Sequence, residues 1–381
     1  MNICPLSQIC QECSNKIAIY SDEGIFTYRQ LDDLIVNFSQ LSQVFFAPIS
    51  LTTVLHFFSL LRRQLPALPI SPQEANLPSI NLSKIPSEIA TLLFTSGTTG
   101  KPKLVMQGLQ QHLYSATHLH QDLKQSQDDR YLISLPLNHI GGIAILFRAF
   151  FSGASIILGN KHKHLATHVS FVPTQLKRYL KDSQPYPHLK ALLLGGAPIP
   201  EELCHLSYQH DIPLYLTYGM TETCSQFATA RYFPDQGIHF GKPLEGRFLS
   251  IDEQKVISVR GQTLFSGYFG DPPLTPNDWF RTADLGHIGP YGLEILGRCD
   301  RVLISGGENI SLDELESVFL DIDPVKQVVL SKRACPEFGE RPVVHLTLSR
   351  PIEVDLLRSL LAQKLARFKI PNREDFHIHV N

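Results

Sequence analysis

Between Tyr131 and Gly219 the sequence alternates between short β-rich runs and helical patterns. In chain order the runs are YLISLP, GGIAILFRAFF, SIIL, HVSFVP, TQLKRYL, LKALLLGG, EELCHLSYQ and PLYLTYG. Such alternation predicts parallel strands that are joined by right-handed crossovers. In open sheets of this kind, ligands bind at the carboxyl ends of the strands. Functional residues are therefore expected on the polar and glycine-rich loops that follow these strands.

The pattern changes twice after this alternation. From Gly241 to Gly297 the short runs RFLSID, KVISVR and GLEILG predict a β-rich subdomain. Ser311 and Glu314 then form a capping-box pattern, and the strands VKQVVLS and PVVHLTLS precede a helix expected from about Glu353 to Phe368. We therefore expect an α/β chain with a large multi-layer domain at residues 1–299, containing parallel α/β sheets and the β-rich subdomain. A small C-terminal α+β domain is expected at residues 300–381.

Charge and hydropathy exclude several classes of partner. The chain has 34 Lys and Arg residues against 36 Asp and Glu residues, so it carries no excess charge that would attract nucleic acid or an anionic membrane. Its start, MNICPLSQICQEC, lacks a basic segment followed by an apolar run, and polar residues interrupt the most apolar stretch, Val44 to Leu61. We expect small-molecule partners, no nucleic acid and no stable membrane insertion.

The cysteines and histidines do not predict a metal site. Seven scattered cysteines in a chain of 381 residues form no disulfide framework, which favours a reducing cytoplasm. Cys10 and Cys13 form a CxxC without a second pair at zinc-site spacing, so we interpret them as part of an amphipathic N-terminal segment. The lysines around His162, His164 and His168 indicate a solvated loop.

The segment TSGTTGKPK follows the apolar strand Thr91 to Phe94 and predicts a phosphate-binding loop. Its glycines, hydroxyls, lysines and free backbone amides can surround a polyphosphate. It is not a Walker A loop, because Pro102 stands where that motif needs a hydroxyl, and a different nucleotide fold is implied. The candidate phosphate-binding residues are Thr95, Ser96, Gly97, Thr98, Thr99, Gly100, Lys101 and Lys103.

A second segment, YGMTE, has the side chains that complete a nucleotide site. Tyr218 offers a π-face for a purine, and Thr221 offers a hydroxyl for a phosphate oxygen. Glu222 is a hard carboxylate ligand of the kind that Mg²⁺ prefers. Alone, such a segment is usually just the end of a strand, so its value depends on the motifs around it.

In this order the motifs resemble the acyl-adenylate-forming, or AMP-binding, superfamily, which includes acyl-CoA ligases, peptide-synthetase adenylation domains and luciferases. The resemblance extends from about Thr27 to Phe368. It implies that Tyr218 and Gly219 contact adenine, and that Asp284 in RTADLG binds ribose with the help of Arg298. Ala283 replaces the glycine that is usual before this aspartate, which is tolerable if its backbone dihedrals are ordinary. The resemblance also implies that a glycine-rich backbone passes against the adenine and the acyl pocket at Gly195, Gly196, Ala197 and Pro198.

For the small domain, the resemblance implies movement between two half-reactions. Asp300 falls at the hinge position, and Gly306 and Gly307 fall in a strand-to-helix loop that flanks the pantetheine arm of CoA. The family continues into a PxTxxGK loop whose lysine assists adenylation, whereas this sequence ends at Asn381. We therefore expect a shortened, mobile small domain without that lysine, and slow adenylation; Lys369 is not credited with the role.

The runs LPLNHIGGI, SFVPTQLKRYL, LLLGGAPIP, YGMTETCSQ and ISGGENIS are most similar to acid:CoA ligases that act on o-succinylbenzoate in menaquinone biosynthesis. This resemblance implies that His139 lies beside the carboxylate and that Ser225 and Gln226 are candidate contacts to a polar aromatic acid. The alternative for His139 is a buried structural histidine, and the alternative for Ser225 and Gln226 is simple packing. The implied catalytic residues are Thr221, Glu222 and His139, with Glu222 as the metal ligand.

The expected activity is that of a cytoplasmic, AMP-forming acid–thiol ligase. It would use ATP, Mg²⁺ and CoA to convert o-succinylbenzoate to its CoA thioester through an acyl-adenylate. Four alternatives stay open: a ligase for another aromatic or fatty acid, a peptide-synthetase domain, an enzyme that retains mainly thioester formation, and a non-catalytic nucleotide-binding homologue. The oligomeric state is also open, a homo-oligomer included.

Overall fold

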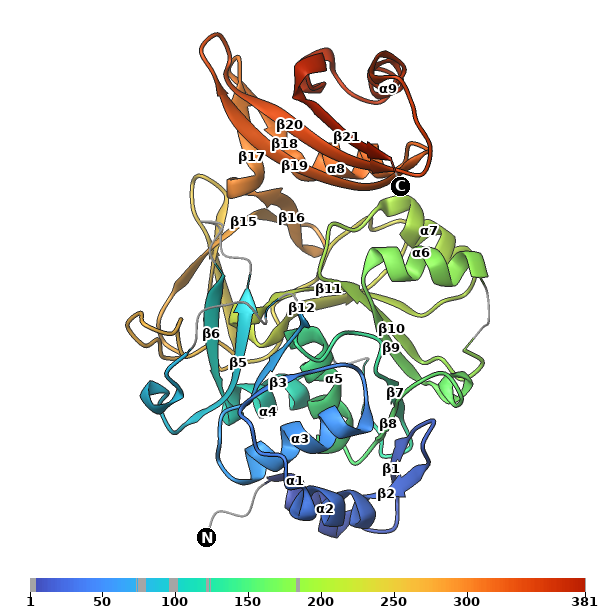
Figure 1. Ribbon diagram of the computed structural model, residues 1–381, viewed down its shortest axis with the longest axis vertical. Helices are drawn as coiled ribbons and strands as arrows, with labels where there is room; N and C mark the ends of the chain where they lie inside the picture. The colour runs from blue at the N-terminus through green and yellow to red at the C-terminus, as the bar shows by residue number, and fades with distance from the viewer. Residues whose placement is uncertain are drawn as a thin grey trace. The chain divides into compact units, whose positions relative to one another are not determined.

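The computed structural model describes residues 5–72, 74, 80–95, 102–120, 123, 125–182 and 186–380. The chain forms two compact units (Figure 1). Unit 1 consists of residues 1–250, 258–281 and 288–294, and unit 2 consists of residues 251–257, 282–287 and 295–381. A four-stranded sheet supplies residues to both units; its strands, in order, are β13 (Arg247–Ile251), β14 (Val256–Gly261), β15 (Phe280–Gly289) and β16 (Gly292–Arg298). The domain boundary expected between residues 299 and 300 is that of the mobile small domain, and it stays a prediction.

The largest sheet of unit 1 has eight strands in the order β12-β11-β10-β9-β7-β8-β1-β2. The inner pairs from β11 to β1 are parallel and the two outermost pairs are antiparallel. The parallel strands predicted between Tyr131 and Gly219 are therefore confirmed. The strand bounds are Ile17–Tyr20 (β1), Ile25–Thr27 (β2), Arg130–Leu132 (β7), Ser155–Ile157 (β8), His168–Phe171 (β9), Ala191–Gly195 (β10), Leu214–Met220 (β11) and Ser225–Arg231 (β12).

Helices lie on both faces of this sheet (Figure 1). Helices α6 and α7 pack on β9, β10 and β11, whereas α5 packs on β7, β8 and β12 and contacts α1 and α4. The helix α5 carries a nearly continuous apolar sequence, IGGIAILFRAFF, because it is buried between the sheet and other helices. The helix bounds are Pro5–Glu12 (α1), Tyr28–Asn37 (α2), Leu51–Arg62 (α3), Leu109–Thr117 (α4), Ile140–Phe151 (α5), Pro173–Asp182 (α6) and Glu201–Gln209 (α7).

The strand order reverses at β7, and this positions the candidate site. β8 lies on one side of β7 and β9, the next strand along the chain, lies on the other. In open α/β sheets the crevice beyond the carboxyl ends of the strands at such a reversal is the usual ligand site. The loop after β7 leads to His139, and the loops after β10 and β11 hold Gly196 and Thr221.

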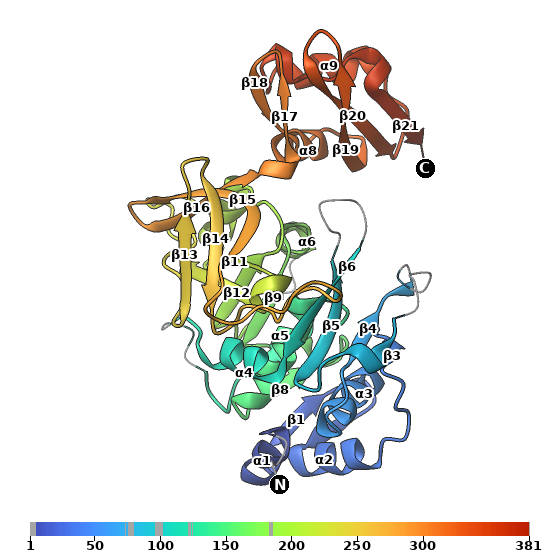
Figure 2. The same cartoon turned by 90° about the vertical axis from the view of Figure 1, so that its left-hand side faces the viewer.

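Unit 1 also contains two smaller strand pairs. β3 (Val44–Phe46) is parallel to β4 (Leu68–Ile70), and β5 (Ile89–Thr95) is antiparallel to β6 (Lys103–Gly108). A parallel bridge from Ala67 to Thr91 continues β4 toward β5. Figure 2 shows β5 and β6 side by side, outside the eight-stranded sheet. The strand before the predicted phosphate loop is therefore part of a separate hairpin.

Unit 2 contains an α+β core in which helices cover a sheet. Its strands are β17 (Val302–Ser305), β18 (Glu308–Ser311), β19 (Val325–Cys335), β20 (Gly339–Leu348) and β21 (Phe376–Val380). α8 (Leu312–Leu320) begins after Ser311, whose side chain accepts a hydrogen bond from the Glu314 amide as predicted. α9 (Val354–Leu361) ends seven residues before the expected Phe368; residues 362–366 are not helical, and a separate 3-10 turn follows at Arg367–Lys369. Leu315, Phe319, Leu357 and Leu361 are fully buried in the shared core.

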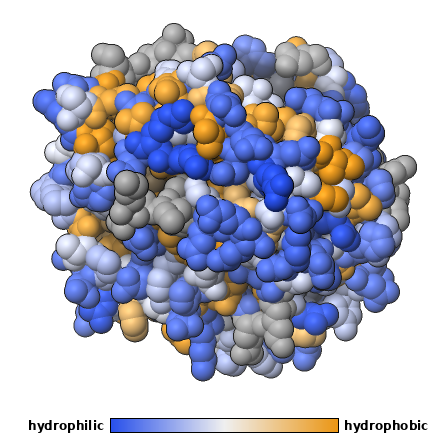
Figure 3. Space-filling model, turned by 90° about the horizontal axis from the view of Figure 1, so that it is seen from below, coloured by the Kyte–Doolittle hydropathy of each residue, from blue (hydrophilic) through white to orange (hydrophobic). Residues whose placement is uncertain are grey.

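The surface of unit 1 is mixed in character. On the face seen in Figure 3, hydrophobic residues form small groups separated by hydrophilic ones, as is usual for protein surfaces. Among the described residues, no helix is long and apolar enough to cross a membrane. The two cysteines of the CxxC are both buried at the end of α1, which agrees with an amphipathic N-terminal segment.

Candidate active site

The β5–β6 hairpin carries the predicted phosphate loop at its tip. Thr95 and Lys103 face each other as the last cross-strand pair before the loop. Pairing on both sides gives the loop two fixed ends, which suits a segment whose backbone must close around a ligand. Of the predicted phosphate residues, Ser96, Gly97, Thr98, Thr99, Gly100 and Lys101 lie outside the described residues.

The YGMTE segment ends β11 and turns sharply into β12. A 3-10 turn covers Thr221–Thr223, and the two residues after it have positive φ, +53° at Cys224 and +81° at Ser225. This tight reversal brings the two strands so close that a Cβ on Gly219 would lie 1.8 Å from the Ser225 carbonyl oxygen. Only glycine fits at position 219, so the motif's glycine has a structural reason here.

The Tyr218 ring is buried against two other aromatic rings. It is 8% exposed, and the rings of Phe227 and Phe240 lie 6.3 Å and 6.0 Å from it, centroid to centroid. The first contact is edge-to-face, a favourable geometry for aromatic pairs. These contacts fix the orientation of Tyr218, and its contact with adenine stays a prediction.

Glu222 is linked to Lys103 through Tyr268, a residue that the sequence interpretation did not single out. The Tyr268 hydroxyl donates to Glu222 Oε1 at 2.7 Å. The Lys103 ammonium lies 4.6 Å from the centroid of the Tyr268 ring, within cation–π range. Among the described residues, Glu222 Oε2 has no hydrogen-bond partner. A half-buried carboxylate with one free oxygen fits Mg²⁺, which usually takes one or two carboxylates and completes its shell with phosphates and water.

The predicted glycine segment lies beside this turn. Gly195 ends β10 directly opposite Thr217 of β11, and a Cβ on Gly195 would lie 2.4 Å from the Thr217 carbonyl oxygen. Gly196 has a φ of +76°, a conformation that glycine adopts without strain. Ala197 and Pro198 follow on the exposed side of the strand end. The contact with adenine and the acyl pocket expected for this segment stays a prediction.

His139 is the N-cap residue of α5 and its side chain is exposed. The alternative of a buried structural histidine is therefore wrong. Its position after β7 places it at the strand-order reversal, where ligands bind in such sheets. Whether it lies beside a substrate carboxylate stays a prediction.

Ser225 contacts a buried arginine that the sequence interpretation missed. Arg148 of α5 is 4% exposed, and its Nη2 donates to Ser225 Oγ at 3.3 Å. Burial lowers the pKa of Arg148 to about 10, so it stays cationic at neutral pH. Among the described residues, Arg148 Nε and Gln226 Oε1 are buried without hydrogen-bond partners. Unpaired buried polar atoms are costly, and a polar ligand group would satisfy them. The sequence signal that could have identified Arg148 is a charged residue inside an otherwise apolar helix.

In unit 2, Asp284 and Arg298 are paired as the resemblance implied. Asp284 lies in β15 (Phe280–Gly289) and is 8% exposed, so it is a buried strand residue. Arg298 ends β16 (Gly292–Arg298), and its Nη1 donates a hydrogen bond to Asp284 Oδ1 at 3.1 Å. Ala283 is not among the residues with positive φ, so its methyl group is tolerated. Asp300 lies in the 3-10 turn Cys299–Arg301 that follows.

Gly306 and Gly307 form the two-residue turn of the β17–β18 hairpin, in which Ser305 pairs with Glu308. Their φ values of +59° and +85° match the turn type that such hairpins favour. The prediction of a direct strand-to-helix loop was wrong, since β18 intervenes before α8. The pattern ENIS is too short to be recognised as a strand without its partner.

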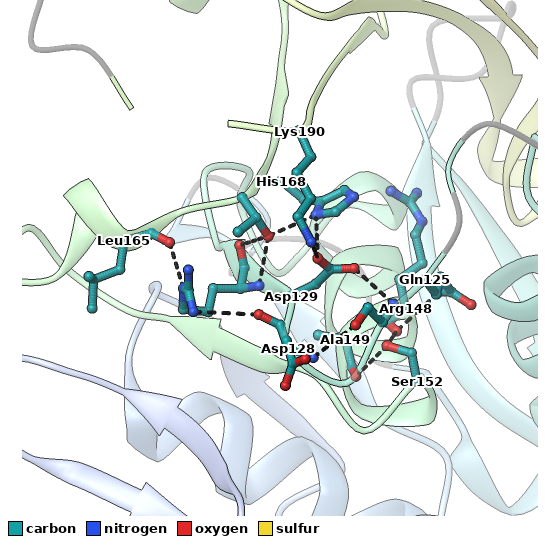
Figure 4. Close-up of polar contacts among 12 residues, drawn as sticks. Gln125, Asp128, Asp129, Arg148, Ala149, Ser152, Leu165, His168 and Lys190 are labelled. Carbon is teal, nitrogen blue, oxygen red and sulfur yellow. Dashed lines mark hydrogen bonds and ion pairs between the residues drawn. The ribbon is translucent and has the colours of Figure 1, made fainter. Parts of the chain in front are cut away.

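A buried charge cluster lies at the opposite ends of the strands, where β7, β9 and β10 begin (Figure 4). Asp129 is fully buried, accepts the Ser126 amide at 2.8 Å and pairs with Lys190 Nζ at 2.7 Å. His168 Nδ1 lies 3.9 Å from the same carboxylate oxygen. Placing His168 in a solvated loop was wrong, because it is the first residue of β9. No group of three or more potential metal ligands occurs among the described residues.

The fold and the arrangement of these motifs identify a class of protein. The family profile described as "AMP-binding enzyme" matches residues 49–269, more than half of the chain. The chain therefore belongs to the AMP-binding enzyme family. Among curated proteins it is similar to the 2-succinylbenzoate–CoA ligases of Bacillus subtilis and Haemophilus influenzae. The identity is 34% over 309 residues for the first and 38% over 297 residues for the second, in each case over 74% of this chain.

Two solved structures of Bacillus subtilis o-succinylbenzoate CoA synthetase are also similar. One is a complex with the acyl-adenylate intermediate OSB-AMP (TM-score 0.78, 26% identity, 99% of this chain and 94% of that chain). The other is a complex with ATP and a magnesium ion (TM-score 0.80, 26% identity, 99% of this chain and 95% of that chain). The chain spans less than two thirds of the length of the two curated relatives, 64% and 65%.

Proposed function

We propose that this chain is an ATP-dependent acid:CoA ligase that acts through an acyl-adenylate, with o-succinylbenzoate as its acid. The observation that carries the proposal is the linked arrangement of Glu222, Tyr268 and Lys103. It joins the turn expected to hold Mg²⁺ to the base of the hairpin that bears the phosphate loop. The relatives named as 2-succinylbenzoate–CoA ligases support the choice of reaction.

In the proposed reaction, an oxygen of the acid carboxylate attacks the α-phosphorus of ATP and pyrophosphate leaves. The CoA thiolate then attacks the carbonyl of the acyl-adenylate, and AMP leaves. The protein's contribution is mainly to position the reactants and to stabilise charge. Thr221 and Lys103 would contact the phosphates, Asp284 and Arg298 would hold the ribose, and Glu222 would hold Mg²⁺, which neutralises phosphate charge when bound.

Arg148 supports an acid that carries a second anionic group. The acid carboxylate that reacts must approach the α-phosphate, so a second carboxylate on the same molecule needs its own cationic partner. Arg148 is cationic and buried, its Nη2 contacts Ser225, and its Nε has no hydrogen-bond partner among the described residues. Buried arginines bind carboxylates through two parallel hydrogen bonds, which favours a dicarboxylic acid over a fatty acid here. Arg148 would thus add a cationic partner to the contacts with the acid expected from Ser225 and Gln226.

The test is pyrophosphate release with a panel of acids, followed by detection of the CoA thioester. The panel contains o-succinylbenzoate, benzoate and a medium-chain fatty acid. We expect release with o-succinylbenzoate, and we expect Arg148→Met to reduce it by at least about tenfold, since a hydrogen-bonded charge is lost. Activity with benzoate should be unchanged by the same substitution. AMP binding without turnover of any acid would instead favour a non-catalytic nucleotide-binding homologue.

The proposed location is the cytoplasm. Six cysteines are unpaired in the described residues, and thiols persist in reducing compartments.

A further inference from the structure

We infer that Tyr268 is a positioning residue that orients the Glu222 carboxylate and separates it from the Lys103 ammonium. The inference rests on the proposed function, because it assigns Glu222 to Mg²⁺ and Lys103 to the phosphates. Tyr268 itself needs to touch neither the metal nor the nucleotide. It acts through the two side chains that it contacts.

The phenol hydroxyl and the ring have separate partners. The hydroxyl donates to Glu222 Oε1 at 2.7 Å, which fixes the rotation of the carboxylate and leaves Oε2 available. The ring faces Lys103 Nζ at 4.6 Å from its centroid. An ammonium that rests on a ring face still has its N–H groups directed elsewhere, toward a phosphate if one is bound. One side chain therefore holds an anion and a cation close together without letting them pair.

The backbone around Tyr268 is held on both sides. Tyr268 bridges Val105 of β6, the Met106 amide donates to the Gly267 carbonyl at 3.0 Å, and the Phe269 amide donates to the Leu104 carbonyl at 2.8 Å. The segment thus pairs, through an isolated antiparallel bridge, with the hairpin that carries the phosphate loop.

The same segment is also tied to the Glu222 turn. The Phe265 amide donates to the Glu222 carbonyl at 2.9 Å, and the Phe265 and Tyr268 rings pack edge-to-face at 4.9 Å. Phe280 packs edge-to-face against both rings, at 5.0 Å from Phe265 and 6.3 Å from Tyr268. These contacts leave the Tyr268 side chain little rotational freedom. A rigid residue between two functional side chains suits positioning, since a misplacement of about 1 Å is enough to reduce catalysis strongly.

Without Tyr268, Lys103 and Glu222 would be free to form a direct ion pair. Such a pair would occupy the carboxylate oxygens needed by the metal and the N–H groups needed by the phosphates. Loss of the hydroxyl alone would release only the carboxylate. Loss of the ring as well would release both groups, so two substitutions at one position give two distinguishable effects.

The experiment measures ATP binding by calorimetry on the full chain, with no acid present, in excess Mg²⁺ and in EDTA. In the unsubstituted protein, Mg²⁺ should increase the affinity for ATP. Tyr268→Phe should reduce this Mg²⁺-dependent gain by about tenfold, the effect of a lost hydrogen bond to a charged group, while affinity in EDTA changes less than about twofold. Tyr268→Leu should lower affinity in both conditions, because Lys103 is released too.

The control is Tyr208→Phe, which removes a hydroxyl from a half-exposed tyrosine on α7 of the same unit. It should leave both affinities unchanged, and thermal unfolding should show that all variants are folded. An equal Mg²⁺-dependent gain in Tyr268→Phe and in the unsubstituted protein would overturn the inference alone. Absence of ATP binding by the unsubstituted protein would overturn the proposed function together with it.

Discussion

Arg298 holds Asp300 through two parallel hydrogen bonds, from Nε to Oδ1 at 2.9 Å and from Nη2 to Oδ2 at 2.7 Å. Its remaining nitrogen, Nη1, donates to Asp284. The hydrogen bonds to Asp300, followed by the nearby carboxylates, raise the pKa of Arg298 further above its already high usual value. The arginine expected to assist ribose binding is therefore also the partner of the expected hinge residue. Substitutions at Asp284 and Asp300 can separate these two roles.

The first prediction concerns the hinge. Asp300→Pro should slow thioester formation more than adenylation, because proline fixes φ near −65° and restricts the dihedral change that a hinge needs. Asp300→Ala is the matched control, since it removes the same hydrogen bonds to Arg298 but leaves the backbone free. The two half-reactions are measured separately, by pyrophosphate release and by reaction of prepared acyl-adenylate with CoA. If proline and alanine have the same effect on both steps, Asp300 is not the hinge.

The second prediction concerns the ribose. Asp284→Ala should weaken AMP binding by about tenfold or more, because a carboxylate that accepts hydroxyl protons is lost. Asp235→Ala, at an exposed position of unit 1, should have no effect. Calorimetry with AMP measures both. Unchanged affinity in Asp284→Ala, with the fold intact, would assign this residue a purely structural role with Arg298.

The third prediction concerns the buried charge cluster at the amino ends of the strands. Lys190→Met should destabilise the protein by about 1–3 kcal/mol, because it removes a hydrogen-bonded cation from the fully buried Asp129 carboxylate. Lys181→Met, at an exposed position of α6, should cost less than about 0.5 kcal/mol. Urea unfolding measures the difference. Nucleotide affinity of the folded variant should be unchanged, since the cluster lies at the opposite ends of the strands from the candidate site.

The fourth prediction concerns acid sensitivity. His112 is stacked on Phe147 at 4.5 Å and bonded to Thr91 Oγ1 at 2.7 Å, and burial lowers its pKa to about 3. A depressed histidine pKa means that the unfolded chain binds the proton first. The contribution of neutral His112 to the free energy of unfolding is therefore present above about pH 6.5 and is lost as pH falls toward 3. Between pH 6.5 and 5 the loss from this residue is about 2 kcal/mol, from about 1.4 kcal/mol per pH unit.

His112→Gln should remove this part of the pH dependence of the free energy of unfolding, even though the variant is less stable at pH 7.5. His210→Gln, at an exposed position, is the control and should keep the unsubstituted slope. Urea unfolding from pH 7.5 to 5 compares the three proteins. Parallel pH profiles for all three would show that His112 does not titrate differently on unfolding. His168, whose pKa burial lowers to about 4, should still contribute its own loss in each protein.

Much of unit 1 could be predicted from the sequence because local pattern and tertiary role agree there. The runs between Tyr131 and Gly219 alternate strand and helix, and parallel pairing follows from that alternation. Asp284 was harder, because Thr, Asp and Gly around it are typical of turns. The ten-residue strand β15 exists because it has neighbours on both sides in its sheet, which no local pattern reveals.

Contacts between distant segments could not be predicted. Tyr268 is 46 residues from Glu222, and its sequence context, SGYFG, suggests only a turn. His168 looks solvated beside the lysines at 161 and 163, yet the strand that begins with it is buried next to β7 and β10. Arg148 was visible as a charge in an apolar helix, but only the fold shows that it points to Ser225. Motifs identify the chemistry of this chain, whereas long-range pairing decides which side chains assist it.

The unpaired atoms of Arg148 and Gln226 imply a conflict between heat resistance and activity in this family member. Among the described residues, the buried Arg148 Nε and Gln226 Oε1 have no hydrogen-bond partners, which lowers the stability of the unliganded fold. Under the proposed function, replacing either with an apolar side chain of similar volume should raise the melting temperature and weaken recognition of the acid. Selection of this chain for thermal tolerance alone would therefore enrich inactive variants at these two positions. Selection in the presence of the acid would preserve both side chains, because the ligand then supplies the missing hydrogen bonds.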